Sequence, residues 1–520
     1  MSSVDGMRRL AVIDLGSNTV KLISLDFRPG HGYRHLDQLR EVVRLSQGLQ
    51  AGGPLQPKAV ERALATLATF RAYCDATGTE RIVATATSAV RDAADGAAFV
   101  ERGRDQAGIE LRVLSGEEEA AYAVLAVANS FAISDAVVMD LGGGSVQLSE
   151  MRARRSVRGE SWPLGAVRAS EGFLKSDPPT KKQLRRLRDA VRDTVGPWLD
   201  VMADADGTRA EPGALPWIGM GGTLRNLADA WQQRSGHPLE LLHGYPLPAG
   251  GLATLTDELA RIDRAGRAEV PGVSADRADI IVAGAVVLDE IVRLAGTDAI
   301  MVSGQGLREG VFYPELFPDQ PHHLTVDVRD FAVRNLMRLY HLDEAHPERV
   351  TRLALQLFDA LADRLGHGPA ERELLAAAAR VHDVGMAIDY YGHHRHGEYL
   401  VLARPLPGFD AREQTLIAAM VRYHRKGRPS AGSRAQLLVD GDEKRLRDLT
   451  GMLRIAEQLD RSKAGRVDSV ACRVGPDVVV LEASCSGDAR LELQEAARRS
   501  ELLAQALGRT IEVVAAATKA

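Results

Sequence analysis

Apolar residues follow two different periods along the first 317 residues of the chain. Short apolar runs typical of β-strands occur at four places, 81–86, 110–114, 215–219 and 298–303. Between them, apolar residues recur at helical spacing, which predicts helices over 57–75, 88–105, 116–129, 180–203, 223–234 and 275–295. Because strands and helices alternate, this part of the chain is predicted to form layered α/β structure.

The pattern changes after about residue 318, where Pro314, Pro318 and Pro321 predict a linker. From 328 to 463 the spacing of apolar residues is helical almost throughout. The tail then predicts a small α+β fold, with strands over 467–474, 477–483 and 510–516 and a helix over 489–507.

An internal repeat relates two segments of the α/β half. Residues 12–22 read VIDLGSNTVKL and residues 138–148 read VMDLGGGSVQL, so that Asp14 aligns with Asp140. Each copy predicts a strand, an Asp-Leu-Gly turn and a second strand, and a repeat near domain length indicates two similar domains that face one another. The predicted organisation is two α/β domains, a helical domain and a small α+β domain, over 1–130, 131–317, 318–465 and 466–520.

Composition and charge narrow the class of protein. Hydrophobic residues make up 45% and charged residues 26%, which excludes a disordered or fibrous chain. With 65 Lys and Arg against 70 Asp and Glu, the net charge of −5 gives no general attraction to nucleic acid or to an anionic membrane. The cysteines are far apart and none lies in a CxxC motif, which argues against a disulfide framework or a cysteine zinc site.

No secretory or membrane segment is predicted, and we expect a cytoplasmic protein. Only the short apolar run 10–13 precedes Asp14, which is too little for a signal peptide. The most apolar stretch, 280–288, ends at Asp289, far short of the roughly 18 residues that a membrane span needs.

The two repeated turns are candidates for phosphate binding. In DLGSNT and DLGGGS several backbone N–H groups can converge, and glycine lets the chain approach an anion closely. The carboxylate before each turn, Asp14 or Asp140, can hold a divalent cation that bridges phosphate oxygens. An ordinary glycine-rich hairpin explains one such turn alone, but the duplicated pair favours a clamp on a phosphate chain.

Three further segments add candidate chemistry. The turn GMGGTLRN at 219–226 opens a predicted helix, whose N-terminus favours phosphate, although a tight strand–helix turn explains it equally well. In LSGEEEAAY, Ser115 and Glu118 fit a capping box, which leaves Glu119 as a catalytic candidate, unless the three glutamates simply complement the helix dipole. Arg91 in TATSAVRDA offers a guanidinium that binds phosphate oxygens in pairs, unless it is simply an exposed helix residue.

Together these motifs resemble those of the Ppx/GppA family of exopolyphosphatases and guanosine pentaphosphate phosphohydrolases. The resemblance covers essentially the whole chain, including GLREG at 306–310 and HDVGMAIDYYGHHRHGEYLV, LPGF and VRYHRKG in the helical region. It implies duplicated actin-like α/β domains (the ASKHA, ribonuclease H-like fold), followed by an all-α HD-like domain and a small C-terminal α+β domain. This fold agrees with the internal repeat.

The resemblance also implies roles for individual residues. Glu119 matches the catalytic base, Asp140 the metal- and water-positioning carboxylate, and Arg91 a phosphate-contacting arginine. The phosphate-binding turns correspond to Asp14, Gly16, Ser17, Asn18, Lys21, Gly142, Gly143, Gly144 and Ser145, and the third turn to substrate contacts from Gly219, Gly221, Gly222 and Thr223. Lys21 is a variation, because TVK stands at 19–21 where some relatives carry Ser-Phe-His, and it is expected to add a cation near the entrance.

The chemistry implied is metal-assisted hydrolysis of a phosphoanhydride. Glu119 would orient and deprotonate a water molecule for in-line attack on the terminal phosphorus. Mg²⁺ or another divalent cation, held by Asp140 and Glu119, would stabilise the transferred phosphoryl group together with Arg91 and backbone amides.

A second candidate site lies in the helical region. His346, the pair His382–Asp383 and Asp460 occur in the order H…HD…D, which resembles the HD phosphohydrolase domain, where four such side chains hold a divalent metal. Further histidines could extend this site, namely His393, His394, His396 and His424. The alternative is a vestigial element whose histidines satisfy hydrogen bonds within the core.

Four functions are consistent with the sequence. The first is an exopolyphosphatase, and the second is the same chemistry on guanosine pentaphosphate, because both substrates present a terminal phosphate. The third is an actin-like nucleotide-binding scaffold with little turnover, and the fourth an HD phosphohydrolase with an actin-like sensor. Inorganic polyphosphate or guanosine pentaphosphate is the expected partner, without nucleic acid or membrane, and the resemblance implies a homodimer.

Overall fold

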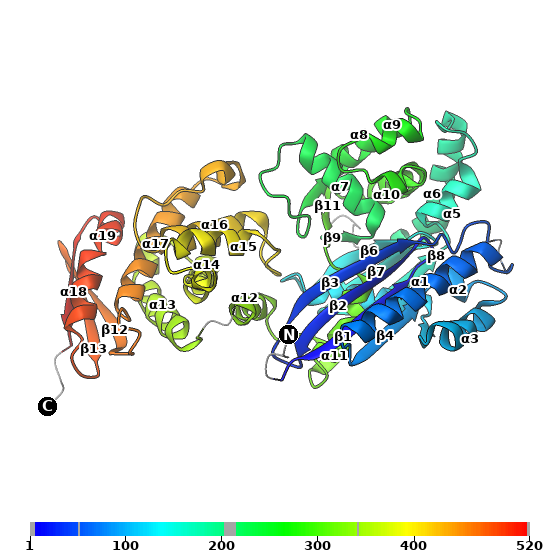
Figure 1. Ribbon diagram of the computed structural model, residues 1–520. Coiled ribbons are helices and arrows are strands. Elements are labelled where there is room, and N and C mark those ends of the chain that lie inside the picture. Colours follow the sequence, from blue (N-terminus) through cyan, green and yellow to red (C-terminus); the bar gives the residue numbers. More distant parts are fainter. Residues whose placement is uncertain (1–5, 50–51, 202–214, 341–342, 517–520) are drawn as a thin grey trace. The chain divides into compact units, whose positions relative to one another are not determined.

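The computed structural model describes residues 6–49, 52–201, 215–340 and 343–516. The chain divides into two compact units, Met1–Val328 and Arg329–Ala520. The first unit is built from two mixed sheets covered by helices, and the second is mostly helical with a small sheet (Figure 1).

The first sheet of the first unit has the strand order β3-β2-β1-β4-β5. β1 forms an antiparallel hairpin with β2. On its other side β1 pairs in parallel with β4, which the chain reaches through a helix. Its strands are β1 (Arg8–Leu15), β2 (Thr19–Arg28), β3 (Gly32–Val42), β4 (Arg81–Ala86) and β5 (Leu111–Val113).

The second sheet repeats this topology, with the order β8-β7-β6-β9-β11 and β10 added at the edge. β6 pairs antiparallel with β7 and parallel with β9, as β1 does with β2 and β4. Its strands are β6 (Ala136–Leu141), β7 (Val146–Arg152), β8 (Arg155–Trp162), β9 (Trp217–Met220), β10 (Pro246–Pro248) and β11 (Ala299–Val302). The duplication predicted from the repeated hairpin is therefore confirmed at the level of sheet topology.

Helices flank both sheets of this unit. They are α1 (Pro57–Ala76), α2 (Ser88–Arg91), α3 (Gly96–Ala107), α4 (Gly116–Ala128), α5 (Ala166–Phe173), α6 (Lys181–Asp200), α7 (Gly222–Arg234), α8 (Ala249–Leu259), α9 (Arg264–Ala268), α10 (Ile281–Ala295) and α11 (Leu307–Leu316). α10 is buried along nearly its whole length and packs against α6, α8 and α5. This burial explains why its sequence is the most apolar stretch of the chain.

Several predicted elements differ from the structure. The helix expected over 88–105 is two helices, α2 and α3, because the chain folds back so closely that a Cβ atom at Gly96 would lie 2.1 Å from the Val90 carbonyl oxygen. The helix expected over 275–295 begins at Ile281, after a short 3₁₀ turn. The end of the helix expected over 180–203 falls partly outside the described residues, and α8 and α9 had not been predicted.

Two helices exchange places between the sheets. α4 precedes the second sheet in sequence, yet it packs on β6, β7 and β8, whereas α11 follows that sheet and packs back on α4 and β1. The contact of α11 with α4 is close, because a Cβ atom at Gly310 would lie 2.1 Å from the Tyr122 carbonyl oxygen. The exchange ties the two α/β halves together and brings Glu119, at the start of α4, to the second sheet.

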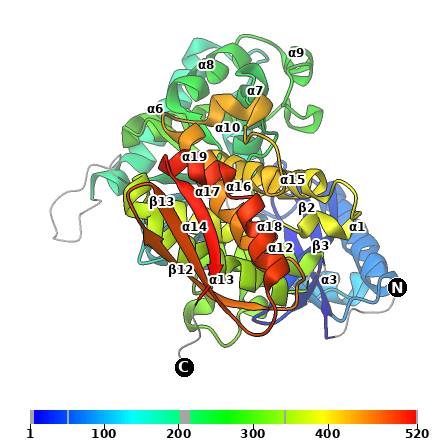
Figure 2. The ribbon, with the colours of Figure 1, turned by 90° about the vertical axis from the view of Figure 1, so that its left-hand side faces the viewer.

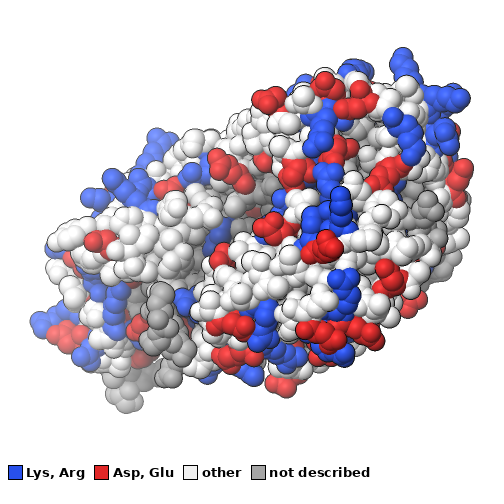
Figure 3. Space-filling view, turned by 45° about the vertical axis from the view of Figure 1, so that its right-hand side comes forward, with Lys and Arg blue, Asp and Glu red and all other residues white. Residues whose placement is uncertain are grey.

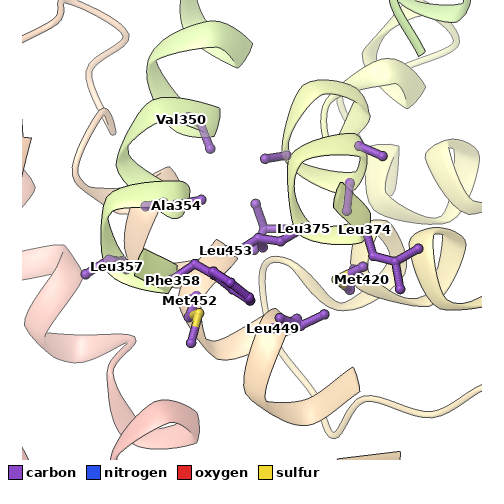
Figure 4. Close-up of a cluster of buried hydrophobic side chains, with 14 of the residues drawn as sticks. Val350, Ala354, Leu357, Phe358, Leu374, Leu375, Met420, Leu449, Met452 and Leu453 are labelled. Atoms are coloured by element: carbon purple, nitrogen blue, oxygen red, sulfur yellow. The ribbon is translucent and has the colours of Figure 1, made fainter. Parts of the chain in front are cut away.

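The second unit has one hydrophobic core shared by its helices and its small sheet. Its helices are α12 (Val328–Leu339), α13 (Ala345–Leu365), α14 (Pro369–Val381), α15 (His393–Leu402), α16 (Ala411–Tyr423) and α17 (Asp442–Gln458). Side chains from α13, α14, α16 and α17 point toward one another, among them Phe358, Leu375, Met420 and Leu453 (Figure 4).

The tail adds a three-stranded sheet and two helices to the same core. Its elements are β12 (Val467–Val474), β13 (Val478–Cys485), α18 (Arg490–Arg498), α19 (Glu501–Leu507) and β14 (Thr510–Ala515), with the strand order β12-β13-β14 (Figure 2). The single helix expected over 489–507 is thus divided in two. Leu481 and Leu503 belong to the cluster that contains Leu353, so the tail packs as part of this unit. Separate domains over 318–465 and 466–520 stay a prediction.

The surface carries both signs of charge. On the face shown in Figure 3, Lys and Arg are interspersed with Asp and Glu, as the small net charge predicts. In the parts of the chain described above, none of the helices combines the length and the apolar character that a membrane crossing needs.

Candidate active site

The two repeated turns have the same geometry. Leu15 pairs with Val20 and Leu141 with Val146, so four residues lie between the last paired positions in each copy. The Gly16 N–H donates to the Thr19 carbonyl over 3.0 Å, and the Gly142 N–H to the Ser145 carbonyl over 2.9 Å. The sequence repeat is therefore also a repeat of turn structure.

The turns lie directly against one another. A Cβ atom at Gly143 would lie 3.1 Å from Asn18 Cβ, and one at Gly144 would lie 2.4 Å from Ser17 Oγ and 2.5 Å from Ser88 Oγ. Any side chain at Gly144 would therefore require these hydroxyls to move. Glycine allows the two turns to approach closely and to present their backbone amides to one cavity.

This cavity collects most of the predicted site residues. The predicted residues that line it are Asp14, Gly16, Ser17, Asn18, Lys21, Glu119, Asp140, Gly142, Gly143, Gly144, Ser145, Gly221 and Gly222. Lys21 was expected near an entrance, but it lines the cavity itself. Residues that the sequence interpretation missed also line it, among them Thr87, Ser88, Gln147, Arg225, Arg277, Arg308 and Glu309. Six of these belong to the motifs quoted above, although none of the six had been predicted as a site residue, whereas Arg277 lies outside every motif.

Two predicted contacts of the third turn do not line the cavity. Gly219 lies within β9, where a Cβ atom would collide with Leu224 and Ile300, and Thr223 is buried against Gly284. Gly221 does line the cavity, and its φ of +104° is one that L-residues rarely adopt. A Cβ atom at this position would lie only 2.2 Å from the Leu141 carbonyl oxygen. The close approach of this turn to β6 therefore depends on glycine.

Glu119 is held by two side chains. Ser115 and Glu118 form the predicted capping box, which leaves the Glu119 carboxylate free of the helix end. One of its oxygens accepts a hydrogen bond from Arg91, and the other accepts one from Gln147 Nε2 over 2.6 Å. The same Gln147 nitrogen lies 2.9 Å from Ser145 Oγ. The carboxylate is thus fixed beside the second glycine turn.

Arg91 lies at the border of a second pocket. Its guanidinium donates to the Leu114 carbonyl over 2.9 Å as well as to Glu119, and it lines a neighbouring pocket together with Arg168 and Trp162. Ser145 lines both this pocket and the cavity. Glu119 lines the cavity and its partner Arg91 lines the second pocket, so the pair lies between the two.

Burial shifts the pKa values of the acidic groups upward. Burial raises the pKa of Glu119 to about 7, against the opposing effect of Arg91 and with a further contribution from Asp140. Burial likewise raises the pKa of Asp140 to about 6, although Arg225 and Lys21 oppose it, and raises the pKa of Asp14.

The basic groups of the cavity shift in the opposite direction. Burial, together with Arg225 and Arg308, lowers the pKa of Lys21 to about 7, and burial lowers the pKa of Arg277 to about 10. One guanidinium nitrogen of Arg308 is buried without a hydrogen-bond partner among the described residues. Because both signs of charge are unfavourable as they stand, the cavity suits a ligand that brings a cation to the carboxylates and an anion to the basic side chains.

The histidine-rich residues of the second unit also converge. His346, His382 and Asp383 form one group of potential metal ligands, and Asp383, His393 and His424 form another. The predicted fourth ligand, Asp460, belongs to neither group. Its carboxylate accepts a hydrogen bond from His346 Nδ1, the ring nitrogen on the opposite side from Nε2. His394 and His396 also fall outside both groups.

The two sheets of like topology define the duplicated actin-like class of fold, and the cavity between the repeated turns is its candidate active site. The chain belongs to the Ppx/GppA phosphatase family, whose model matches residues 26–317, and the model of Ppx/GppA phosphatase, domain III, matches residues 328–493.

Known relatives agree with this assignment. The chain is 32% identical over 315 residues to exopolyphosphatase 1 of Mycobacterium bovis, which covers 59% of this chain and 88% of that protein. It is 26% identical over 422 residues to the guanosine-5'-triphosphate,3'-diphosphate pyrophosphatase of Aliivibrio fischeri, which covers 80% of each chain. The crystal structure of an exopolyphosphatase from Cytophaga hutchinsonii aligns with a TM-score of 0.54 at 26% identity, over 59% of this chain and 98% of that one.

Proposed function

We propose that this protein is a phosphoanhydride hydrolase, an exopolyphosphatase that removes the terminal phosphate of inorganic polyphosphate. The observation that carries the proposal is the placement of Glu119, a buried carboxylate fixed by Arg91 and Gln147 beside two apposed glycine turns. The name of the mycobacterial relative, exopolyphosphatase 1, supports the same activity.

Glu119 acts as the general base in this proposal. A pKa of about 7 keeps the carboxylate close to the ideal for a base at neutral pH. Arg91 and Gln147 hold its two oxygens, so that the carboxylate can orient a water molecule toward a phosphorus atom in the adjoining turns. Little covalent work is required of the protein, because phosphoryl transfer depends mainly on position and charge.

The donor set fits a divalent cation with a preference for oxygen ligands. Asp14 and Asp140 occupy equivalent positions before the two turns, and burial raises the pKa of both, which indicates negative charge that a cation would stabilise. Mg²⁺ bound to Asp140 and Glu119 would supply positive charge against the phosphoryl oxygens. The backbone amides of residues 143–145 would bind those oxygens from the other side.

The basic side chains favour a substrate with several phosphates. Lys21, Arg225, Arg277 and Arg308 line the same cavity as the glycine turns. A single phosphoryl group cannot engage all of them, whereas a chain of phosphates presents an anionic oxygen at every unit. This distribution of charge favours a substrate with several phosphates, and the name of the mycobacterial relative places polyphosphate before guanosine pentaphosphate.

Guanosine pentaphosphate is the second candidate substrate. The Aliivibrio fischeri relative, whose name is that of a guanosine nucleotide pyrophosphatase, covers 80% of this chain and thus extends into the second unit. Removal of a 5′-terminal phosphate would use the same turns, the same base and the same cation.

One comparison of substrates tests the proposal. Phosphate release would be measured from long polyphosphate, tripolyphosphate, guanosine pentaphosphate and ATP at equal terminal-phosphate concentration. We expect long polyphosphate to give the highest kcat/KM. A higher kcat/KM for guanosine pentaphosphate would make that nucleotide the first candidate substrate and polyphosphate the second. If none of the four is hydrolysed in the presence of Mg²⁺ or Mn²⁺, the hydrolase function is wrong. A homodimer also stays a prediction, to be checked by the solution mass.

A further inference from the structure

We propose that the second unit carries a centre for two divalent transition-metal ions, in which Asp383 is the ligand that both ions share. The other ligands are four imidazole nitrogens, from His346 and His382 for one ion and from His393 and His424 for the other. This ligand set differs from the H…HD…D quartet, because two added histidines enter it and Asp460 leaves it.

The four rings are oriented so that Nε2 faces the shared carboxylate. In each ring the opposite nitrogen, Nδ1, lies within hydrogen-bond distance of an oxygen that can only accept. His382 Nδ1 lies 2.7 Å from the Ala379 carbonyl, and the corresponding distances are 2.9 Å from His393 to the Tyr390 carbonyl and 2.7 Å from His424 to the Val421 carbonyl. Because Nδ1 must carry the proton in each contact, Nε2 is left with a lone pair, which is the form that binds a metal.

Among the described residues, no hydrogen-bond donor faces these lone pairs. The Nε2 atoms of His346 and His382 are buried and lack a hydrogen-bond partner among the described residues. The Nε2 atoms of His393 and His424 lie 3.3 Å apart, so that two lone pairs face each other. A buried acceptor without a donor costs free energy, and a cation between the rings would remove this cost.

The spacing of the ligand atoms fits metal coordination. Asp383 oxygens lie 3.7 Å from His346 Nε2, 3.7 Å from His382 Nε2 and 3.4 Å from His393 Nε2. Bonds of about 2.1 Å in a tetrahedral arrangement place ligand atoms roughly 3.4 Å apart. A set of imidazoles with one carboxylate favours Zn²⁺, Mn²⁺, Fe²⁺ or Co²⁺ over Mg²⁺.

Asp460 acts as a positioning residue for the first ion. One of its oxygens lies 2.8 Å from His346 Nδ1 and accepts a hydrogen bond over 2.8 Å from Arg349 Nε, while the other accepts the Gly465 N–H over 2.9 Å. The carboxylate is therefore saturated, and it fixes the orientation of the His346 ring from behind.

Lys463 competes with the metal in this arrangement. Its ammonium lies 2.6 Å from the Asp383 oxygen that also faces His346, so it supplies a positive charge where the first ion would bind. The Lys463 side chain is 47% exposed, which allows it to move into solvent when an ion displaces it. Loading of the first position is thus coupled to release of this lysine.

Metal binding by the full-length protein tests the proposal. The protein would be stripped with a chelator, titrated with Mn²⁺, Zn²⁺ and Co²⁺ in turn, and its bound metal counted by elemental analysis after desalting. We expect two equivalents in the wild type, about one in His393→Ala, and none in Asp383→Asn, with an unchanged circular dichroism spectrum. His394→Gln, one residue away on α15 and outside both ligand groups, is the matched control and should keep two equivalents.

Two more variants test the remaining parts. Asp460→Asn should keep two equivalents but weaken the affinity of one of them by roughly 10- to 100-fold, with a changed visible spectrum of bound Co²⁺. Lys463→Met should bind the first ion more tightly than the wild type. A wild type that binds no metal, or metal content that is the same in Asp383→Asn, overturns the centre. One equivalent in the wild type overturns the two-ion assignment, and unchanged affinity in Lys463→Met overturns the competition.

Discussion

The two units bring together different kinds of ligand for a cation. In the first unit the potential ligands are carboxylates at the ends of strands and at a helix start, surrounded by backbone amides and arginines. In the second unit they are imidazoles on helices around a single carboxylate. Oxygen ligands and converging amides suit a Mg²⁺–phosphate complex, whereas imidazoles suit a transition metal. The two proposed sites would therefore hold different kinds of cation.

The way in which each site is built also differs. The first depends on two chain segments that repeat one another and on α4, which crosses to the second sheet. The second is built within one helical core and needs no duplication. If the phosphatase reaction belongs to the first unit, changes in the two sites should have separable effects on activity.

The largest effect is expected from Glu119→Gln. Loss of a positioned base should lower turnover by at least about 100-fold, while the hydrogen-bonding shape of the side chain is kept. Phosphate release from tripolyphosphate measures the effect. Glu118→Gln is the matched control, because Gln also serves in a capping box and this variant should stay close to the wild type. Near-normal turnover in a folded Glu119→Gln protein would show that the base lies elsewhere.

Substitutions of the two equivalent aspartates, Asp14 and Asp140, should change different kinetic properties. We expect Asp140→Asn to raise the Mg²⁺ concentration needed for half-maximal activity, because Asp140 pairs across the hairpin with Gln147, which holds the Glu119 carboxylate. Asp14→Asn should act mainly on KM for the phosphate substrate. Magnesium titrations at several substrate concentrations separate the two effects, and the reverse ranking would overturn the assignment of the turns.

A dependence on pH follows from the raised pKa of Glu119. The base must be deprotonated to act, and its pKa is raised to about 7, so kcat/KM should fall about tenfold per pH unit below pH 7. The measurement is a profile of kcat/KM from pH 5.5 to 8 at fixed Mg²⁺. Gln147→Leu should move this limb to higher pH, because it removes a hydrogen bond to the carboxylate. A limb centred near pH 4.5 would contradict the assignment.

The smallest effect on short substrates is expected from the double variant His382→Ala with Asp383→Ala. It removes ligands of the second unit, so metal bound there should be lost, while hydrolysis of tripolyphosphate should stay largely intact. Some loss on long polyphosphate is expected if this unit supplies part of the track for the chain. Elemental analysis and circular dichroism of the same preparation distinguish an emptied site from a misfolded unit. Loss of tripolyphosphate hydrolysis in a folded protein would place the reaction in the second unit instead.

Much of the first site could be predicted because it depends on residues that lie close together in the sequence. The repeated hairpin depends on glycine and an aspartate at fixed positions, and a turn of this kind is determined by residues next to each other in sequence. The capping box at Ser115 and Glu118 is equally local, and it correctly left Glu119 free. The break between α2 and α3 was missed because it depends on a close contact at Gly96, which a helical pattern does not record.

The sequence by itself determined the duplicated α/β architecture, the two glycine turns and the residues that match a family motif, since these depend on short-range patterns of apolar residues and glycine. Only the tertiary structure decided which distant groups meet. The crossing of α4 places Glu119 against Gln147, and packing brings Arg277 into the same cavity. Folding of the helical core likewise brings His393 and His424 next to Asp383 and places Asp460 against His346 Nδ1. Contacts between residues that are distant in sequence depend on how whole helices and strands pack, and a local sequence pattern does not contain that information.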